Sequence, residues 1–157
     1  MSMNKKASKY LYIETAMSAL CNAILNYAAA FAIFHGRSLI PATGPDSLLR
    51  DSIGEAFLVT FLSVLFPSLI ARHRRRTGAL PAPVEKPTPA GNLYVRALIT
   101  GLVFTCVFVA CNALLLPRIF PNGVVYKDVL LFKTIFGTVI GAIATYVAVH
   151  KSLREVG

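Results

Sequence analysis

The chain has 157 residues, of which 55% are hydrophobic and only 15% are charged, and its mean hydropathy is +0.63. This composition excludes an ordinary soluble domain, because four long apolar stretches leave no other segment large enough to form a core. The net charge of +9 could indicate nucleic-acid binding. No binding module accompanies it, so we expect no nucleic-acid partner.

The four apolar stretches cover residues 10–34, 53–71, 97–116 and 129–150. An α-helix rises about 1.5 Å per residue, so about 20 apolar residues cross the ~30 Å hydrocarbon core of a bilayer. The sequence therefore predicts an all-α membrane protein, with four transmembrane helices that form a bundle of two helical hairpins. Residues 1–157 make a single membrane domain in this interpretation, and a Pro-rich linker at residues 77–92 joins the hairpins.

Lys and Arg are distributed unequally between the loops that these spans define. Cytoplasmic loops carry an excess of basic residues, so we expect the linker and both termini to be cytoplasmic. Small size and basic inner loops favour a bacterial inner membrane. Arg72, Arg74, Arg75 and Arg76 are interpreted as a topology anchor that also attracts anionic lipid. The basic residues on the predicted inner side are Lys5, Lys6, Lys9, Arg72, Arg74, Arg75, Arg76, Lys86, Arg96, Lys151 and Arg154; those outside are Arg37, Arg50, Arg118 and Lys127.

The first span carries four polar residues at steps of four, Glu14, Ser18, Asn22 and Asn26. This spacing places them along one helix face, which must meet other helices or water because polar groups are costly in lipid. In one interpretation the amides form hydrogen bonds across helices, worth about 0.6–2 kcal/mol each, and Glu14 reaches the inner interface. In the other, the stripe lines a transport path with Glu14 as a proton or cation site. General experience with membrane helices favours the first.

The first half of the chain contains a pattern that occurs in a known group of membrane proteins. The pattern consists of Asn22 in the first span and of Phe66-Pro67 and Arg74-Arg75 at the end of the second. This half resembles the short bacterial two-helix membrane hairpins that are grouped as a domain of unknown function. The second half has Asn112 but no Phe-Pro and no Arg-Arg, so the match there is poor. The resemblance implies a hairpin architecture, in tandem if both halves belong to it, and no activity.

The two halves also share a short echo, because Cys21-Asn22-Ala23 in the first span is matched by Cys111-Asn112-Ala113 in the third. A duplicated hairpin, with both copies in the same orientation, is one explanation of this echo. No Cys-x-x-Cys pair is present. We therefore expect the three cysteines, Cys106 included, to be buried thiols that act as small apolar residues.

The fourth span contains Lys133, Gly137 and Gly141, again at steps of four. The Gly-x-x-x-Gly spacing lets a neighbouring helix approach closely, and Lys133 shares that face, so it points into the bundle. Glu55 in the second span lies at a similar depth, and a Lys133–Glu55 ion pair would relieve the desolvation of both groups. We interpret the pair as an outer-leaflet staple; the alternative is a gate or a charged substrate site.

The sequence contains no His-x-x-x-His motif, nucleophile elbow or phosphate-binding loop. We therefore expect that the protein is not an enzyme and that it has no catalytic residue, metal site or cofactor. The first functional hypothesis is a small transporter or channel, formed by several copies, with the stripe from Glu14 to Asn26 along its path. The second is a non-catalytic accessory or scaffold subunit of a larger membrane complex. The lipid bilayer is a partner in both.

Overall fold

The computed structural model describes residues 5–80, 88–89 and 92–156. Four long helices dominate them: α1 (Lys5–Phe34), α2 (Leu48–Arg76), α3 (Leu93–Ile119) and α4 (Tyr126–Ser152). Each is long and apolar enough to cross a membrane, and each begins a few residues before its predicted span. The predicted all-α fold with four candidate membrane-spanning helices is confirmed, and the chain is accordingly a multi-pass membrane protein.

Local signals in the sequence set the ends of these helices. Ser47 caps α2, with its hydroxyl oxygen accepting a hydrogen bond from the backbone N–H of Arg50 at 3.2 Å. Asn92 caps α3 in the same way by accepting from the backbone of Tyr94 at 3.0 Å. These caps supply acceptors for amides that the first turn leaves without partners. The last turn of α2 is basic, which complements the partial negative charge at a helix C-terminus.

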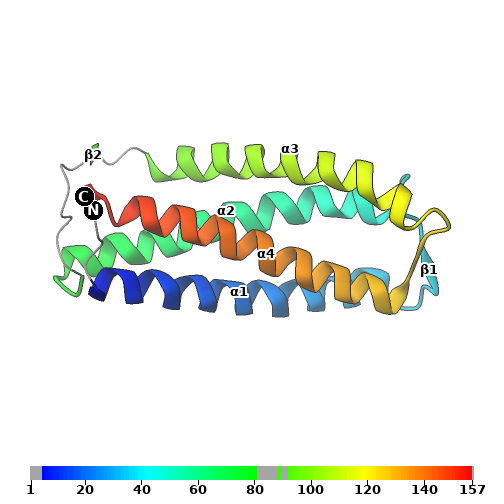
Figure 1. The fold of residues 1–157 in the computed structure, drawn as a ribbon, viewed down its shortest axis with the longest axis horizontal. Coiled ribbons are helices and arrows are strands. Elements are labelled where there is room, and N and C mark those ends of the chain that lie inside the picture. The colour runs from blue at the N-terminus through cyan, green and yellow to red at the C-terminus, as the bar shows by residue number, and fades with distance from the viewer. Residues whose placement is uncertain (1–4, 81–87, 90–91, 157) are drawn as a thin grey trace.

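The four helices run side by side along the long axis of the molecule (Figure 1). α1 packs mainly along α4, α4 also packs along α2, and α2 packs along α3. α1 shares few contacts with α2, the helix that follows it in the sequence, and the same holds for α3 and α4. The two central helices are therefore α2 and α4, and each outer helix packs on the central helix of the other predicted hairpin.

Two short strand pairs connect segments that are distant in the sequence. β1 (Leu39–Ile40) pairs antiparallel with β3 (Val124–Val125), and β2 (Thr88–Pro89) pairs in parallel with β4 (Glu155–Val156). Gly123 has a φ of +92°, and an added Cβ would lie 3.0 Å from the backbone oxygen of Ile40. Glycine thus permits the close approach of β1 and β3. These strands could not be predicted from the sequence, because a strand of two residues is too short to show a periodic pattern.

Both chain ends lie at the same end of the bundle, and β1 lies at the opposite end (Figure 1). We refer to these as the terminal end and the loop end. Residues 77–80 of the predicted Pro-rich linker, 77–92, follow α2 at the terminal end, and residues 81–87 and 90–91 of that linker lie outside the described residues.

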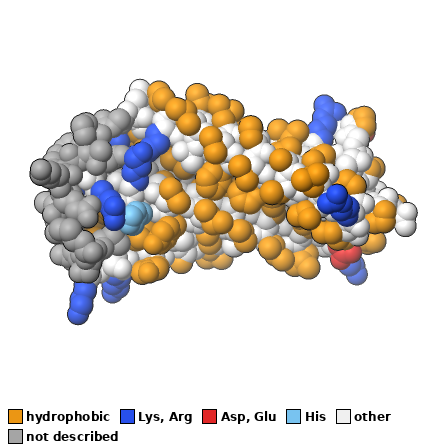
Figure 2. All heavy atoms as spheres, turned by 45° about the horizontal axis from the view of Figure 1, so that its top comes forward, with side chains coloured by type: hydrophobic (Ala, Val, Ile, Leu, Met, Phe, Trp, Pro, Cys, Tyr) orange, Lys and Arg blue, Asp and Glu red, His pale blue; other side chains and the backbone are white. Residues whose placement is uncertain are grey.

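The outer surface of the bundle is apolar between two charged ends. Figure 2 shows hydrophobic side chains over the middle of the visible face and Lys and Arg side chains toward both ends. This is the pattern that a bilayer requires of the protein that it surrounds. Cys21, Cys106 and Cys111 are exposed on this surface. The expectation that these thiols are buried inside the protein is therefore wrong, because a place within an apolar span does not distinguish a side chain that faces the protein from one that faces outward.

Candidate functional site

A buried lysine lies between two carboxylates in the half of the bundle nearer the loop end. The side chain of Lys133 on α4 is 2% exposed. Its Nζ lies 2.5 Å from Oδ2 of Asp51 and also contacts Oε2 of Glu55, both on α2. Asp51 and Glu55 are four residues apart, so one face of α2 presents both to the same ammonium group. We call these three residues the charged cluster.

The charged cluster holds more negative than positive charge when all three groups are ionised. Its two carboxylates face one ammonium group, and the exposed fractions of the Glu55 and Asp51 side chains are 7% and 22%. Oε1 of Glu55 is buried and has no hydrogen-bond partner among the described residues. Buried charges are costly unless they are paired and hydrogen-bonded. The charged cluster therefore lacks both a full charge balance and a full set of hydrogen bonds.

Asn112 on α3 lies at the same depth as Lys133. The ring of Phe108 contacts that of Phe136 on α4, with centroids 5.7 Å apart, and Leu116 packs in one cluster with Val129 of α4. Asn112 is one helical turn from both Phe108 and Leu116. Its side chain is buried, and its Nδ2 has no partner in the described part of the chain. A second unsatisfied polar atom therefore lies at the level of the charged cluster.

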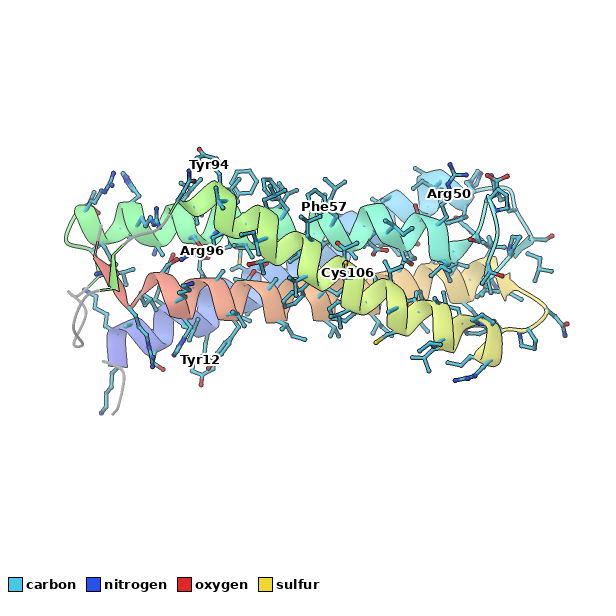
Figure 3. All side chains as sticks on the ribbon, turned by 90° about the horizontal axis from the view of Figure 1, so that it is seen from above. Tyr12, Arg50, Phe57, Tyr94, Arg96 and Cys106 are labelled. Atoms are coloured by element: carbon cyan, nitrogen blue, oxygen red, sulfur yellow. The ribbon has the colours of Figure 1, made fainter. Side chains whose placement is uncertain are left out.

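A cavity of about 420 Å³ opens beside the charged cluster at the loop end. It is formed where the end of α1 meets the loop before α2 and the first turns of α2. Asp51 lines this cavity and contacts Lys133, so it links the buried pair to the surface. Figure 3 shows Arg50, another lining residue, at this end of the molecule. The lining residues are Ile33, Phe34, Arg37, Pro45, Asp46, Ser47, Arg50, Asp51 and Gly54.

The predicted polar stripe of α1 meets the predicted glycine face of α4. Asn22 lies against Gly141 and Asn26 lies against Gly137, so closely that a Cβ at either glycine would overlap with the asparagine side chain. Asn22 Nδ2 donates to Oγ of Ser63 on α2 at 3.1 Å, and Asn26 Nδ2 donates to the backbone oxygen of Asn22 at 2.7 Å. Glycine thus makes room for the amides, and the stripe forms the α1–α4 interface.

Ser18 continues this interface toward the terminal end. The hydroxyl of Thr145 on α4 lies 2.6 Å from Oγ of Ser18 and 3.2 Å from the backbone oxygen of Ser63. Thr145 is fully buried, so three helices meet at this point through hydroxyl groups. The part of the stripe from Ser18 to Asn26 is packed between helices and has hydrogen-bond partners along its length.

Glu14, the remaining member of the stripe, lies near the terminal end and is half-buried. Its Oε1 accepts a hydrogen bond from the hydroxyl of Tyr10 at 2.8 Å. The guanidinium of Arg74 lies over the Tyr10 ring, 5.2 Å from its centroid, in a cation–π arrangement. Glu14 is thus separated from the charged cluster by the length of the polar interface.

The basic residues at the terminal end also join helices to one another. Arg75 donates to the backbone oxygen of Ser152 at 2.8 Å. Arg96 on α3 donates to Oγ of Ser68 at 3.2 Å and to Oγ of Ser152 at 2.9 Å, and Figure 3 shows it at this end. Arg72 is half-buried and Arg76 is exposed. Of the arginines predicted as a topology anchor, Arg75 therefore joins α2 to the end of α4.

Asp51 is the member of the charged cluster that sequence reasoning missed. The predicted second span began at residue 53, which left Asp51 in a loop, although its spacing of four from Glu55 was visible in the sequence. No group of three or more His, Cys, Asp and Glu side chains that could hold a metal ion is found among the described residues.

Comparison of the chain with family models, with curated proteins and with solved structures finds no match. The resemblance to two-helix hairpins of a domain of unknown function therefore stays a prediction.

Proposed function

We propose that this chain is a small membrane transport protein whose ion-binding site is the charged cluster. The observation that carries the proposal is the burial of Lys133 between Glu55 and Asp51. Ionisable side chains within membrane-spanning segments are costly, and they typically mark ion or proton pathways. Well-packed hydrophobic residues would hold two helices together at a lower cost, so a purely structural role does not account for three charges.

The stripe on α1 does not serve as the path in this proposal. Its amides fill the space beside Gly137 and Gly141, and a water-filled route there would require α1 to separate from α4. The cavity at the loop end instead connects the charged cluster to the surface through Asp51.

We propose further that both termini face the cytoplasm of a bacterial inner membrane. The support is the concentration of Lys and Arg at the terminal end, since basic residues are retained on the cytoplasmic side. Lys133 and Glu55 are each the eighth residue of their helices. At about 1.5 Å per residue, both then lie about two turns inside the outer surface.

Ion flux through reconstituted vesicles tests the proposal. The purified chain is placed in liposomes, and proton, Na⁺ and Cl⁻ fluxes are measured with entrapped dyes under an imposed K⁺ diffusion potential. We expect flux of at least one ion with the wild-type chain and loss of that flux with Glu55→Gln. Glu14→Gln is the matched control at the other end of the bundle, and it should retain the flux. Absence of flux for all three ions, or equal flux in Glu55→Gln, would contradict the proposal.

A second candidate function, an accessory subunit of a membrane complex, is favoured by the position of α3. Only 11% of the most apolar window of α3 is buried inside the protein, the lowest share among the four helices. Its main contact is with α2, and its remaining faces carry exposed apolar side chains, which are Leu98, Ile99, Leu102, Val103, Val107, Leu114 and Leu115. This surface suits either lipid or another membrane helix.

Native mass spectrometry of the chain, extracted gently with its own lipids, separates the two candidates. A homo-oligomer without any other polypeptide supports the transport proposal and justifies the flux measurements. A stoichiometric second polypeptide supports the accessory role and identifies the complex.

A further inference from the structure

The charges of the cluster do not balance, which leaves room for one more positive charge. Two carboxylates and one ammonium group leave one unit of negative charge when all are ionised, and only the Asp51 side chain is more than 10% exposed. An unbalanced charge in a setting of low dielectric is strongly disfavoured. A further proton or a further cation would remove the imbalance.

The geometry favours a proton over a second cation. Lys133 Nζ already lies between Asp51 Oδ2 and Glu55 Oε2, so a metal cation there would be repelled by the ammonium group at close range. A metal cation also needs several oxygen ligands, whereas a proton needs only one. Glu55 Oε1 is that oxygen, because it is buried and has no hydrogen-bond partner within the described part of the chain.

We propose that Glu55 is a proton-binding residue, which takes up a proton from water in the loop-end cavity with Asp51 as the intermediate carrier. Asp51 is suited to this role because it lines the cavity and also contacts Lys133. A hydronium ion in the cavity gives its proton to Asp51 and becomes water. The proton then moves to Glu55, where a new O–H bond forms at Oε1. Release follows the reverse order, and no group is oxidised or reduced.

The other charged and titratable groups around this route come from several elements. Arg37, Asp46 and Arg50 line the cavity with Asp51, and the Arg50 guanidinium donates to the backbone oxygen of Pro45 at 2.9 Å. α4 contributes Lys133 and, nearer the loop end, the buried hydroxyl of Tyr126. At this depth α3 contributes Asn112, which does not titrate.

Proton binding at Glu55 can be tested without measuring ion flux. The inference rests on the proposed transport function only in assigning the bound proton a role in transport. The full chain is placed in lipid nanodiscs, and infrared difference spectra are recorded across a pH titration. A protonated carboxyl group gives a C=O stretching band that a carboxylate lacks. We expect a titrating carboxyl band that disappears in Glu55→Gln, shifts in frequency in Glu55→Asp and remains unchanged in Asp128→Asn, whose side chain is exposed on the first turn of α4.

Two results would overturn the assignment of Glu55. The first is the absence of any titrating band that depends on Glu55, including in Glu55→Asp, which keeps the carboxyl group if Glu55→Gln fails to fold. The second is removal of the band by Na⁺ at constant pH, which would identify a metal-cation site. If the band titrates as expected but vesicles show no flux, the proton site stands and the transport function fails.

Gly54→Leu tests the route through the cavity. Gly54 lines the cavity, and a Cβ added there meets no atom within 4 Å, so the larger side chain is expected to narrow the cavity without disturbing the charges. After a rapid pH jump, the Glu55 band should form more slowly in this variant than in the wild-type chain. An unchanged rate would exclude the cavity as the proton route.

Discussion

The α1–α4 interface and the charged cluster are both polar regions inside an apolar bundle. They differ in how many of their polar atoms have hydrogen-bond partners and in whether their charges are balanced. At the interface, the side-chain amide nitrogens of Asn22 and Asn26 donate hydrogen bonds, and glycines on α4 accommodate their bulk. In the charged cluster, Glu55 keeps an oxygen without a partner, and the charges do not balance. Neutral polar groups with hydrogen-bond partners are typical of a structural interface, whereas charged groups without partners are typical of a functional site.

The two regions share α4, which gives the comparison its physical basis. Lys133, Gly137 and Gly141 follow one another along α4 and are all buried. The glycines admit α1 at close range, and Lys133 extends toward α2 at the end of the same row. A rigid α1–α4 pair would therefore hold Lys133 in place while the carboxylates of α2 exchange a proton.

The largest expected effect comes from Lys133→Met. Removing the ammonium group leaves the buried Glu55 carboxylate and the partly exposed Asp51 carboxylate without their partner, and breaking a buried ion pair costs about 3–5 kcal/mol. The measurement is the free energy of unfolding in mixed micelles or bicelles. Lys127→Met is the matched control, since Lys127 is exposed on the first turn of the same helix, and it should change stability little.

A triple variant, Lys133→Met with Glu55→Gln and Asp51→Asn, sharpens this prediction. It removes all three charges, so it should recover part of the stability that Lys133→Met loses. If the single and triple variants are equally unstable, the loss comes from packing of the lysine stem, and the charge argument is wrong.

A smaller effect is expected at the α1–α4 interface from Gly141→Ala. The added methyl group overlaps with the side chain of Asn22, and overpacking of this kind costs about 1–3 kcal/mol. Gly54→Ala is the matched control, because its Cβ meets nothing within 4 Å and alanine is favoured over glycine within a helix by about 1 kcal/mol. Unfolding measurements should therefore show opposite signs for the two substitutions, and a loss in both would count against close packing at Gly141.

Much of the fold followed from the sequence because a membrane limits the choices. Four apolar stretches of sufficient length could only be helices, and steps of four residues identified the buried faces that include Asn22, Gly141 and Lys133. The partners of these faces could not be predicted, since periodicity shows which side of a helix is buried but not which helix covers it. For this reason the sequence predicted a stripe on α1 and a glycine face on α4 without predicting that they meet.

The candidate site could be predicted only in part for a related reason. Lys133 and Glu55 stood out as charges within apolar stretches, and a shared depth was enough to suggest a pair. Asp51 lies just before the apolar part of α2, where hydropathy cannot separate a helical residue from a loop residue. The cavity could not be anticipated, because it depends on how the loop before α2 folds against the end of α1.

The smallest predicted effect on stability concerns Asn22 and Asn112, the two asparagines of the sequence echo. Asn22 is level with Gly141, whereas Asn112 is level with Lys133. These α4 positions are eight residues apart, which corresponds to a difference in depth of about 12 Å. A parallel repeat related by an axis along the membrane normal keeps equivalent residues at one depth. The echo thus does not relate equivalent positions, and the two amides need not act alike.

Asn22→Ala and Asn112→Ala remove the same atoms from two buried sites, which differ in the hydrogen bonds that the side-chain amide makes. Asn22 Nδ2 donates to Oγ of Ser63 and to the backbone oxygen and Oγ of Ser18, whereas Asn112 Nδ2 has no partner among the described residues. We expect Asn22→Ala to lose more unfolding free energy than Asn112→Ala, by about 0.6–2 kcal/mol. Equal losses would mean that Asn112 also has a hydrogen-bond partner, such as a bound water. The contrast between the two regions would then concern charge alone.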